Sequence, residues 1–490
     1  MEQKQRQNDF LEMVCNLYIV FLLAVLPLYT NGSYYKIGDS KYMLFRNVSL
    51  LCLGIWLVVA GAAFVMGTKE RRKWSLVDSF VLLYGICVLL SAGASPFQKT
   101  AWTGYQDWYM GAFSQLLFVG IYFFVSREYA YTRMPLYLGE LAFLAVTVIG
   151  LLSRLGLDPI GLFAGIGEKD WEYSHMLSTI GNINWLCGYY SVALSLPMSG
   201  YFQSRKKEKT VSLYIISVLG LLLLCIQGSD SGLMLAFLAI VTGFVVGIRK
   251  KEILYRTVWL AAGVTFLFPL MGKLIEWREM QAATPTDGDI FAKMLWQGWW
   301  LVAALLLLFG IFMKRKMVRK VVCVLLTGSG IILLGCVCVK FVQDISRGNI
   351  VWQEWGSGRG MLWNLSWKGF VSFSTLRMLV GAGPDCFAEY LSSVGISTVI
   401  TETEHWAGAV FANAHNEWLN HMVNLGLLGT GCYLGIFVSA WKRYRGMLLA
   451  VLLLILYGAH SMISFQQVLN TPLFFLLLGI CENTVRRVTD

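Results

Sequence analysis

The residues best suited to chemistry gather in one long polar segment, from about 344 to 417, and at the start of the apolar stretch after it. Three of the five histidines of the chain lie within or just after this segment, which also contains five tryptophans and two glycine-rich turns. Loops beyond about 12 to 15 residues are usually functional or disordered. Because so aromatic a composition is not that of a disordered chain, we expect this loop to carry the function.

The first candidate is Arg359, in the glycine-rich run that opens GSGRGMLWNLSWKGF at 356–370. The apolar and aromatic residues after it have a spacing that suits a helix lying in the headgroup zone of a membrane. An arginine at a glycine-rich helix start, where backbone N–H groups are free, could bind phosphate oxygens through its guanidinium. The alternative is that Arg359 contacts lipid headgroups or pairs with an acid of the loop.

The second candidate is His415, where the loop enters an apolar stretch through AHNEWLNHMVNLGLLG. Asn416, Asn420 and Asn424 recur at four-residue spacing and predict a polar ridge on an otherwise apolar helix. Polar groups at such depth usually face a wet cavity or another helix. Histidine has the ordinary pKa that suits proton transfer near neutrality, although a histidine that only caps or bridges helices would fit the same position.

Weaker candidates surround these two. Gly381 and Gly383, in VGAGPDCFAEY, permit either a plain tight turn or the close approach of a ligand. The D-x-D pair at 287 and 289 and the acidic cluster at 402–405 have oxygen ligands that could hold a cation, but a helix start and a solvated loop explain them equally well. We therefore expect neither a metal nor a cofactor.

The elements that must position these residues follow from composition, which is 57% apolar and only 14% charged. Soluble proteins carry about 25% charged residues, and a membrane-spanning helix needs about 20 mostly apolar residues. The chain therefore predicts an all-α polytopic membrane protein with about 12–14 transmembrane helices. The expected spans are 14–31, 44–66, 76–94, 111–126, 134–153, 183–203, 211–227, 231–248, 254–272, 291–313, 321–343, 418–441, 446–463 and 470–485.

The basic residues predict the orientation of these spans. If the N-terminus is cytoplasmic, every second connection should be basic, and the basic clusters follow this rule; they lie at 69–73, 205–209, 249–251, 314–320, 442–445 and 486–487. The net charge of +11 then reflects the topology and attracts anionic lipid at the inner face of the membrane. We expect no nucleic-acid partner. We expect both termini inside, and one integral domain made of a bundle (1–343), a large extracytoplasmic loop (344–417) and C-terminal helices (418–490).

Taken in order, Arg359 in its glycine-rich turn, the G-x-G-P turn and the HN…GLLG element resemble the O-antigen ligase and O-antigen polymerase (Wzy-C-type) superfamily. Two further segments are similar to family motifs: GNINWLCGYYSVAL at 181–194 matches its Gly-Asn-x-Asn segment, and GYQDWYMGAF at 104–113 matches its Gly-x6-Gly loop. The likeness covers most of the chain, and its most specific part lies between 356 and 430.

The resemblance implies a bacterial membrane glycosyltransferase with a GT-C-like fold and short interfacial helices in the large loop. Its members transfer a glycan from an undecaprenyl-pyrophosphate carrier, at the outer face of the cytoplasmic membrane, to a hydroxyl of a glycan, lipid or protein. By this likeness Arg359 would bind the pyrophosphate and His415 would activate or orient the acceptor hydroxyl. The remaining substrate-binding residues that we expect are Asn416, Arg377, Gly381, Gly383 and Trp363.

One position departs from the family pattern. Many ligases have an arginine after a serine in the turn that here reads QGSDSGLML, whereas this chain has Asp230 and Ser231. Arg154, Arg278 and Lys293 are the cations that could replace it in space. The departure leaves ligase and polymerase activities both open.

A transporter or flippase of lipid-linked glycan is the alternative function, since so many spans suit it. Such proteins usually contain two repeated halves with interrupted helices, and no internal repeat is visible here. A purely structural scaffold would leave the clustered His, Arg and Asn residues without a role.

Overall fold

The computed structural model describes residues 2–67, 72–167, 173, 175–281, 304–306, 343, 355–398 and 410–489. Within these ranges the chain is predominantly helical, and the only strands are the short antiparallel pair β1 (Met176–Leu177) and β2 (Gly181–Asn182). Two of the expected spans, 291–313 and 321–343, lie outside the described residues apart from 304–306 and 343. The expectation of an all-α membrane protein is confirmed for the part of the chain that is described.

Eight helical segments of the described chain are long and apolar enough to cross a membrane. The corresponding helices are α1 (Glu2–Val20) continued by η1 (Phe21–Val25) and α2 (Leu26–Leu28), η2 (Tyr34–Lys36) joined to α3 (Ile37–Val65), α4 (Leu76–Ala94), α7 (Met134–Arg154), α11 (Lys207–Ile226), α12 (Asp230–Arg249), α13 (Lys251–Gln281) and α20 (Glu417–Tyr444). The other long helices are α6 (Ala112–Glu128), α9 (Ile183–Ala193), α10 (Ser195–Gln203), α21 (Leu448–Ser461) and α22 (Thr471–Thr489).

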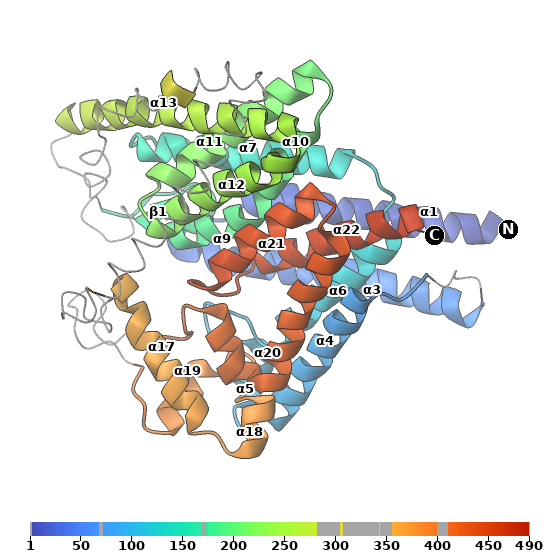
Figure 1. Ribbon diagram of the computed structural model, residues 1–490. Helices are drawn as coiled ribbons and strands as arrows, with labels where there is room; N and C mark the ends of the chain where they lie inside the picture. Colours follow the sequence, from blue (N-terminus) through green and yellow to red (C-terminus); the bar gives the residue numbers. More distant parts are fainter. Residues whose placement is uncertain are drawn as a thin grey trace.

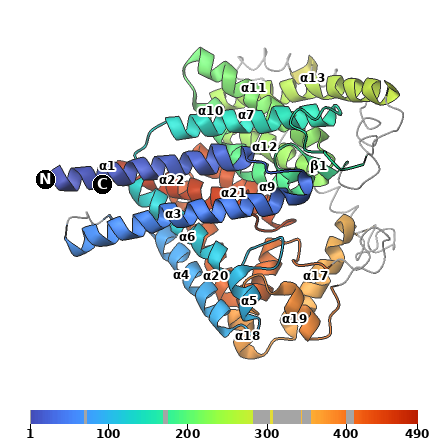
Figure 2. The same ribbon diagram turned by 180° about the vertical axis from the view of Figure 1, so that it is seen from behind.

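The two termini lie together at one end of the bundle (Figures 1 and 2). Successive long helices run alternately away from this end and back to it, which we call the terminus end. The basic connections between α3 and α4, α10 and α11, α12 and α13, and α20 and α21 all lie at the terminus end by this alternation. The other connections, including the one that leads into α20, meet at the opposite end, which we call the site end.

Helix α22 is the centre of the bundle. From Leu473 to Cys481 every residue is buried. A helix that is apolar all round must be enclosed by others, and α6, α21 and α20 pack against it. This enclosure buries residues 464–470, which lead into α22.

Helix α20 is broken about one turn before its midpoint by Gly426, whose φ is 67°. The break frees backbone carbonyls of the preceding turn, and the loop after α18 (Thr375–Val380) uses them. The N–H groups of Ala382 and Gly383 donate to the carbonyls of Val423 and Asn424 at 2.9 and 3.0 Å. The chain at 381–383 therefore pairs with the helix much as a strand would, and fixes the site end of α20.

Three shorter helices form the described part of the expected large loop: α17 (Trp355–Val371), α18 and α19 (Phe387–Ser393). They lie on the side of the bundle away from the two termini (Figure 1). Helix α17 buries one face, which includes Leu362, Ser366 and Phe370, while Trp367 and Lys368 of the same helix are exposed. The predicted helix at 361–370 is thus present, and it packs against α20 and α19.

Candidate functional site

Arg359 and His415 are brought to the same short segment of chain. The Nε atom of Arg359, on α17, donates to the carbonyl of Ile463 at 3.0 Å. The ring of His415 packs edge-on against Phe465, with ring centroids 4.9 Å apart and planes at 82°. The two residues that were expected to act together therefore meet over residues 463–465, although they are far apart in the sequence.

The charge of Arg359 also affects the pKa of His415. Burial lowers the pKa of His415 to about 3, and the positive charge of Arg359 adds to this effect. Burial also lowers the pKa of Arg359, while the negative charge of Asp230 opposes that shift. At neutral pH the site thus presents a neutral imidazole near a guanidinium. Asp230, which stands in the turn where many ligases have an arginine, is close enough for its charge to affect the pKa of that guanidinium.

The backbone at His415 is held in an unusual conformation. Its φ is 46°, in the left-handed region that residues with a Cβ rarely adopt, and such strain often marks functional positions. The side-chain oxygens of Asn413 and Asn420 accept from the N–H groups of His415 and Ala414 at 3.1 and 3.3 Å. Asparagine side chains therefore fix the direction in which the imidazole points.

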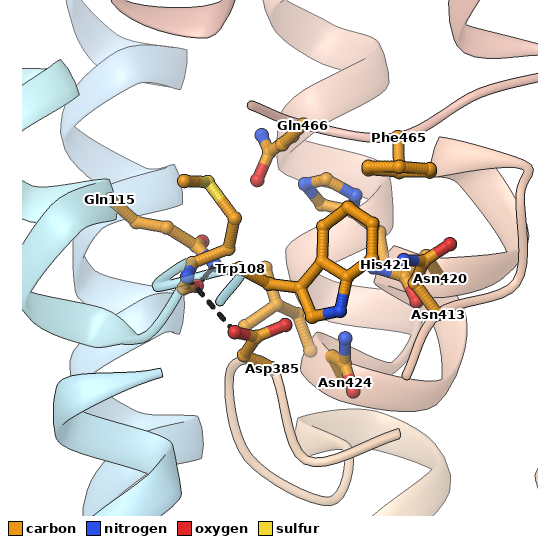
Figure 3. Close-up of a pocket in the computed structure, with 11 residues that line it drawn as sticks. Trp108, Gln115, Asp385, Asn413, Asn420, His421, Asn424, Phe465 and Gln466 are labelled. Carbon is orange, nitrogen blue, oxygen red and sulfur yellow. Dashed lines mark hydrogen bonds between the residues drawn. The ribbon is translucent and has the colours of Figure 1, made fainter. Parts of the chain in front are cut away.

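A pocket lies next to this pair, between α20, the 104–110 loop, the 381–386 loop and the 462–470 segment. It is small and partly open to solvent, and it is lined largely by polar side chains that turn toward one another around Trp108 (Figure 3). Asn420 and Asn424 of the predicted polar ridge both line it, as does His421. The ridge therefore faces a polar cavity, as the spacing indicated.

Asp385 closes one side of the pocket and joins two loops. One carboxylate oxygen accepts from the backbone N–H groups of Tyr105 and Met110 at 2.7 and 2.9 Å. Burial nevertheless raises the pKa of Asp385 to about 7, and the charge of Glu389 adds to that effect. This carboxyl can exchange a proton near neutrality, at the border of the pocket.

A chain of hydrogen bonds runs from the pocket into the bundle. The Nδ1 atom of His421 lies 2.7 Å from the carbonyl of Glu417, so Nδ1 is the donor. The hydroxyl of Tyr84 lies 3.1 Å from Nε2 of His421 and 2.7 Å from Oε1 of Gln115. One hydroxyl proton cannot satisfy both acceptors at once. Tyr84 therefore donates to either Gln115 or His421.

The segment at 462–470 lies between these groups and is irregular, although residues 464–470 are all buried. Non-helical backbone at membrane depth occurs where it is enclosed by protein or lines a cavity. Gln466 borders the pocket, and the side-chain amide of Gln467 has no hydrogen-bond partner among the described residues. Gln466 and Gln467 are consecutive amides in a largely apolar stretch, and this was the sequence signal for this part of the site. They were not among the expected site residues.

An arginine from another helix contacts the turn QGSDSG. The guanidinium of Arg154, at the end of α7, donates to the carbonyl of Gln227. In the same turn the hydroxyl of Ser229 donates to Oδ1 of Asn184 at 3.0 Å, which ties the turn to the GNIN segment. Of the three cations proposed as replacements, Arg154 is at the turn; the side chains of Arg278 and Lys293 lie outside the described residues.

The remaining expected site residues are placed differently. Trp363 is partly buried, one helical turn along α17 from Arg359. Asn416 is the N-cap of α20, and its side chain accepts from the N–H of Leu419 at 3.1 Å. Arg377 donates to the carbonyls of Gly381 and Ala94 at 3.2 and 3.3 Å, and so ties α18 to the end of α4.

The two glycines of the G-x-G-P turn are in close contact with other parts of the protein and do not border open space. A Cβ on Gly381 would lie 2.3 Å from the carbonyl oxygen of Asn424, and one on Gly383 would lie 2.4 Å from the hydroxyl of Ser95. The close approach that these glycines permit is that of α20 and α4. Their expected part in substrate binding stays a prediction.

Metal ligation has no support within the described residues, where no three His, Cys, Asp or Glu side chains come close enough to hold an ion. The acids at 287, 289, 402 and 404 lie outside the described part of the chain. The chemistry that the described geometry offers is therefore that of a guanidinium, a neutral imidazole, a carboxyl of raised pKa and several amides.

Trp108, Asp385, Gln466 and Gln467 were not expected from the sequence as site residues. Two of them lay inside segments that had been singled out, since Trp108 is in the 104–113 loop and Asp385 follows the G-x-G-P turn. Comparison of the chain with models of known protein families and with curated protein sequences finds no match.

Proposed function

We propose that this protein is a glycosyltransferase of the bacterial cytoplasmic membrane that transfers or polymerises glycans carried on undecaprenyl pyrophosphate. The observation that carries the proposal is the meeting of Arg359 and His415 over residues 463–465, at the border of a polar pocket. The GT-C-like arrangement and the interfacial placement of α17–α19 belong to the same proposal. Its family basis is the set of motifs around these residues.

The location of the pocket supports transfer at the outer face. The basic connections lie at the terminus end, and the site lies among the connections of the other end. By the positive-inside rule the terminus end is cytoplasmic. The site then faces the side on which lipid-linked glycans are displayed.

The proposed reaction divides the work between the two residues. The acceptor hydroxyl attacks C1 of the donor sugar, the C1–O bond to pyrophosphate breaks, and its electron pair leaves on a phosphate oxygen. Arg359 neutralises the charge that grows on that oxygen. His415 accepts the hydroxyl proton through its free nitrogen and then releases it to the leaving phosphate or to water.

The low pKa of His415 fits this order of events. The cation of Arg359 contributes to keeping the pKa low, so a bound pyrophosphate, by neutralising that cation, raises the pKa of His415. The imidazole therefore becomes a better base when the donor is bound. This coupling would limit proton abstraction to the loaded site.

Chromosomal replacement in the native host tests the proposal. We expect Arg359→Ala and His415→Ala each to lower surface-glycan formation at least about 100-fold, with accumulation of lipid-linked glycan. Arg133→Ala, an exposed arginine at the terminus end, is the matched control and should behave as the wild type. Blotting of the protein in membranes checks insertion.

The proposal is wrong if both site variants insert normally and still form surface glycan at the wild-type level. A transporter would instead show transport of lipid-linked glycan in vesicles that survives the loss of His415. A ladder of repeat lengths in the wild type would indicate a polymerase, and a single capped product a ligase.

A further inference from the structure

A second cavity lies directly beside the pocket of Figure 3 and shares Trp108 and Gln466 with it. It is partly open to solvent, and its walls differ from those of the first pocket because they contain four aromatic side chains and fewer amides. Trp108, Trp185, Tyr42 and Tyr109 all border it. Neither the proposed transfer step nor the motifs of the sequence gives this cavity a role.

The indole ring of Trp185 forms part of one wall and is held in place by its neighbours. Its ring lies against Gly38 and Gly181, where an added Cβ would be only 3.1 and 3.4 Å from the indole carbons. Trp108 meets it edge to face, with centroids 6.2 Å apart and planes at 77°. Because glycine backbone supports the ring so closely, the indole has little freedom to turn away from the cavity.

One residue that borders the same cavity carries a buried amide without a hydrogen-bond partner among the described residues. Gln467 lines the cavity and is only 7% exposed, and both its Nε2 and its Oε1 lack partners among the described residues. Its backbone N–H is held by Oδ1 of Asn470 at 2.8 Å, so the residue itself is fixed. A buried amide left without partners costs about 1–3 kcal/mol, which favours a ligand that completes its bonds.

The loop that contributes Trp108 is also held under strain. Asp107 and Tyr109 on either side of it have φ values of 69° and 56°. Asp107 is exposed and borders the cavity, so a carboxylate is available at this side of the aromatic wall. Strained positions of this kind persist only where the surrounding structure enforces them, and they cluster at ligand sites.

We propose that this second cavity is a saccharide-binding subsite, in which a sugar ring lies against Trp185 and its hydroxyl groups bond Gln467 and Asp107. A sugar ring has an apolar C–H face that suits an aromatic plate and a rim of hydroxyls that suits amides and carboxylates. Apolar walls with a few convergent polar groups are the usual make-up of small-ligand sites. The inference rests on the proposed function and names the place where its glycan would bind.

The subsite is connected to the reacting pair by a row of rings. His415 contacts Phe465 at 4.9 Å, Phe465 contacts Trp108 at 4.7 Å, and Trp108 contacts Trp185 at 6.2 Å, measured between centroids. A saccharide held on Trp185 therefore has its neighbouring sugar near the pocket of Figure 3. Either the donor glycan or the acceptor glycan fits this description.

Saturation-transfer NMR on the full-length protein in nanodiscs tests the subsite without requiring turnover. The probes are methyl glycosides of glucose, galactose and N-acetylglucosamine, together with their β-linked disaccharides. We expect saturation of ring protons for at least one probe, reduced five-fold or more by Trp185→Ala and by Gln467→Leu. Trp102→Ala, an exposed tryptophan of α5 (Gln98–Thr103), is the matched control and should leave the signal unchanged.

Gln467→Leu keeps the result decisive even if Trp185→Ala fails to fold, because it removes an amide that has no partners. An unchanged signal in folded Gln467→Leu, or no saturation for any probe in the wild type, overturns the subsite. If transfer depends on Arg359 while the subsite fails this test, the proposed function stands alone. If transfer is independent of Arg359 while both cavity variants lose the signal, the subsite stands and the proposed function fails.

The transfer assay separates the two sources of saccharide. Gln467→Leu should raise the KM for the lipid-linked donor if the donor glycan occupies the subsite, and the KM for the acceptor if the acceptor does. A change in kcat with neither KM altered would contradict occupancy by either one.

Discussion

Two buried polar clusters lie at different depths of the same bundle and are built in opposite ways. Near the terminus end, the carboxylate of Asp78 is bound by Arg127 and Arg486 and by the hydroxyl of Tyr122. Glu482 is bound in turn by Arg443, through both carboxylate oxygens at 2.7 and 2.9 Å, and by Tyr444. This terminus-end cluster joins α4, α6, α20 and α22 through ion pairs.

The site-end cluster contains amides, imidazoles and one carboxyl of raised pKa, and its bonding is incomplete. The Oδ1 atom of Asn424 and both amide atoms of Gln467 have no partner among the described residues. Buried polar groups are normally satisfied, so amides without partners at the site end stand in contrast to opposite charges in contact at the terminus end. The terminus-end cluster holds helices together, whereas the site-end cluster keeps hydrogen-bonding capacity for a ligand.

The largest stability effect should come from breaking the terminus-end cluster. Asp78→Asn leaves Arg127 and Arg486 without their shared carboxylate, and such a loss costs about 3–5 kcal/mol. The matched change in the site-end cluster, Gln467→Leu, should leave the free energy of unfolding within about 1 kcal/mol of the wild type or raise it. Reversible unfolding in mixed micelles measures both.

Equal losses of stability in Asp78→Asn and Gln467→Leu would remove the distinction between the two clusters. A stable Asp78→Asn protein would show that the ion pairs are not what joins these helices.

A smaller effect should follow from crowding the loop that supports the site end. Gly381→Ala places a Cβ 2.3 Å from the Asn424 carbonyl oxygen at a φ of 80°, and we expect a loss of about 3 kcal/mol. Gly395→Ala is the matched control, because its φ of 75° is similar but nothing lies within 4 Å of its Cβ position. It should lose only about 1 kcal/mol, from strain alone.

Thermal midpoints of the two glycine variants give the comparison directly. Similar midpoints would mean that the 381–383 segment does not pack on α20 as described.

The smallest effect concerns the pH response of the site-end cluster. The pKa of Asp385 rises from an ordinary 3.8 to about 7 in the folded protein, so the folded state binds the proton more tightly than the unfolded state. The stability contributed by this group is complete below about pH 4 and is lost as the pH rises to about 7. Asp385→Asn can still accept from Tyr105 and Met110 but does not titrate.

The thermal midpoint of Asp385→Asn, minus that of the wild type, should therefore increase between pH 4 and 7 and level off above pH 7. The subtraction cancels the other titrating groups. A difference that stays constant over this range would contradict a raised pKa for Asp385.

The sequence predicted the fold far better than it predicted the site. Apolar runs and basic clusters act locally, and each of the twelve expected spans that falls in the described residues corresponds to a helix or a broken helix. The pairing of Arg359 with His415 was implied by a family likeness, and the geometry brings them to one segment. Arg377 could not be told from Arg359 by type, since only packing shows that it binds carbonyls at the end of α4.

What the sequence could not predict depends on contacts between distant segments. Trp108 and Gln467 belong to two loops whose sequences do not indicate that they lie together. They border the same cavity only because the buried helix α22 holds the segment before it inside the bundle. The break in α20 at Gly426 likewise coincides with bonds from the distant loop at 381–383 to the carbonyls of the preceding turn. Periodicity describes one helix at a time, so it carries no information about which loop fills which gap.

The central claim is that Arg359 and His415 together transfer a glycan from a pyrophosphate carrier. The most direct measurement is the release of undecaprenyl pyrophosphate by purified protein in proteoliposomes supplied with undecaprenyl-pyrophosphate-linked oligosaccharide and a hydroxyl acceptor. We predict release with formation of a new glycosidic product in the wild type and in Arg133→Ala, and a loss of at least about 100-fold in Arg359→Ala and His415→Ala. Undiminished release in both folded site variants would contradict the claim.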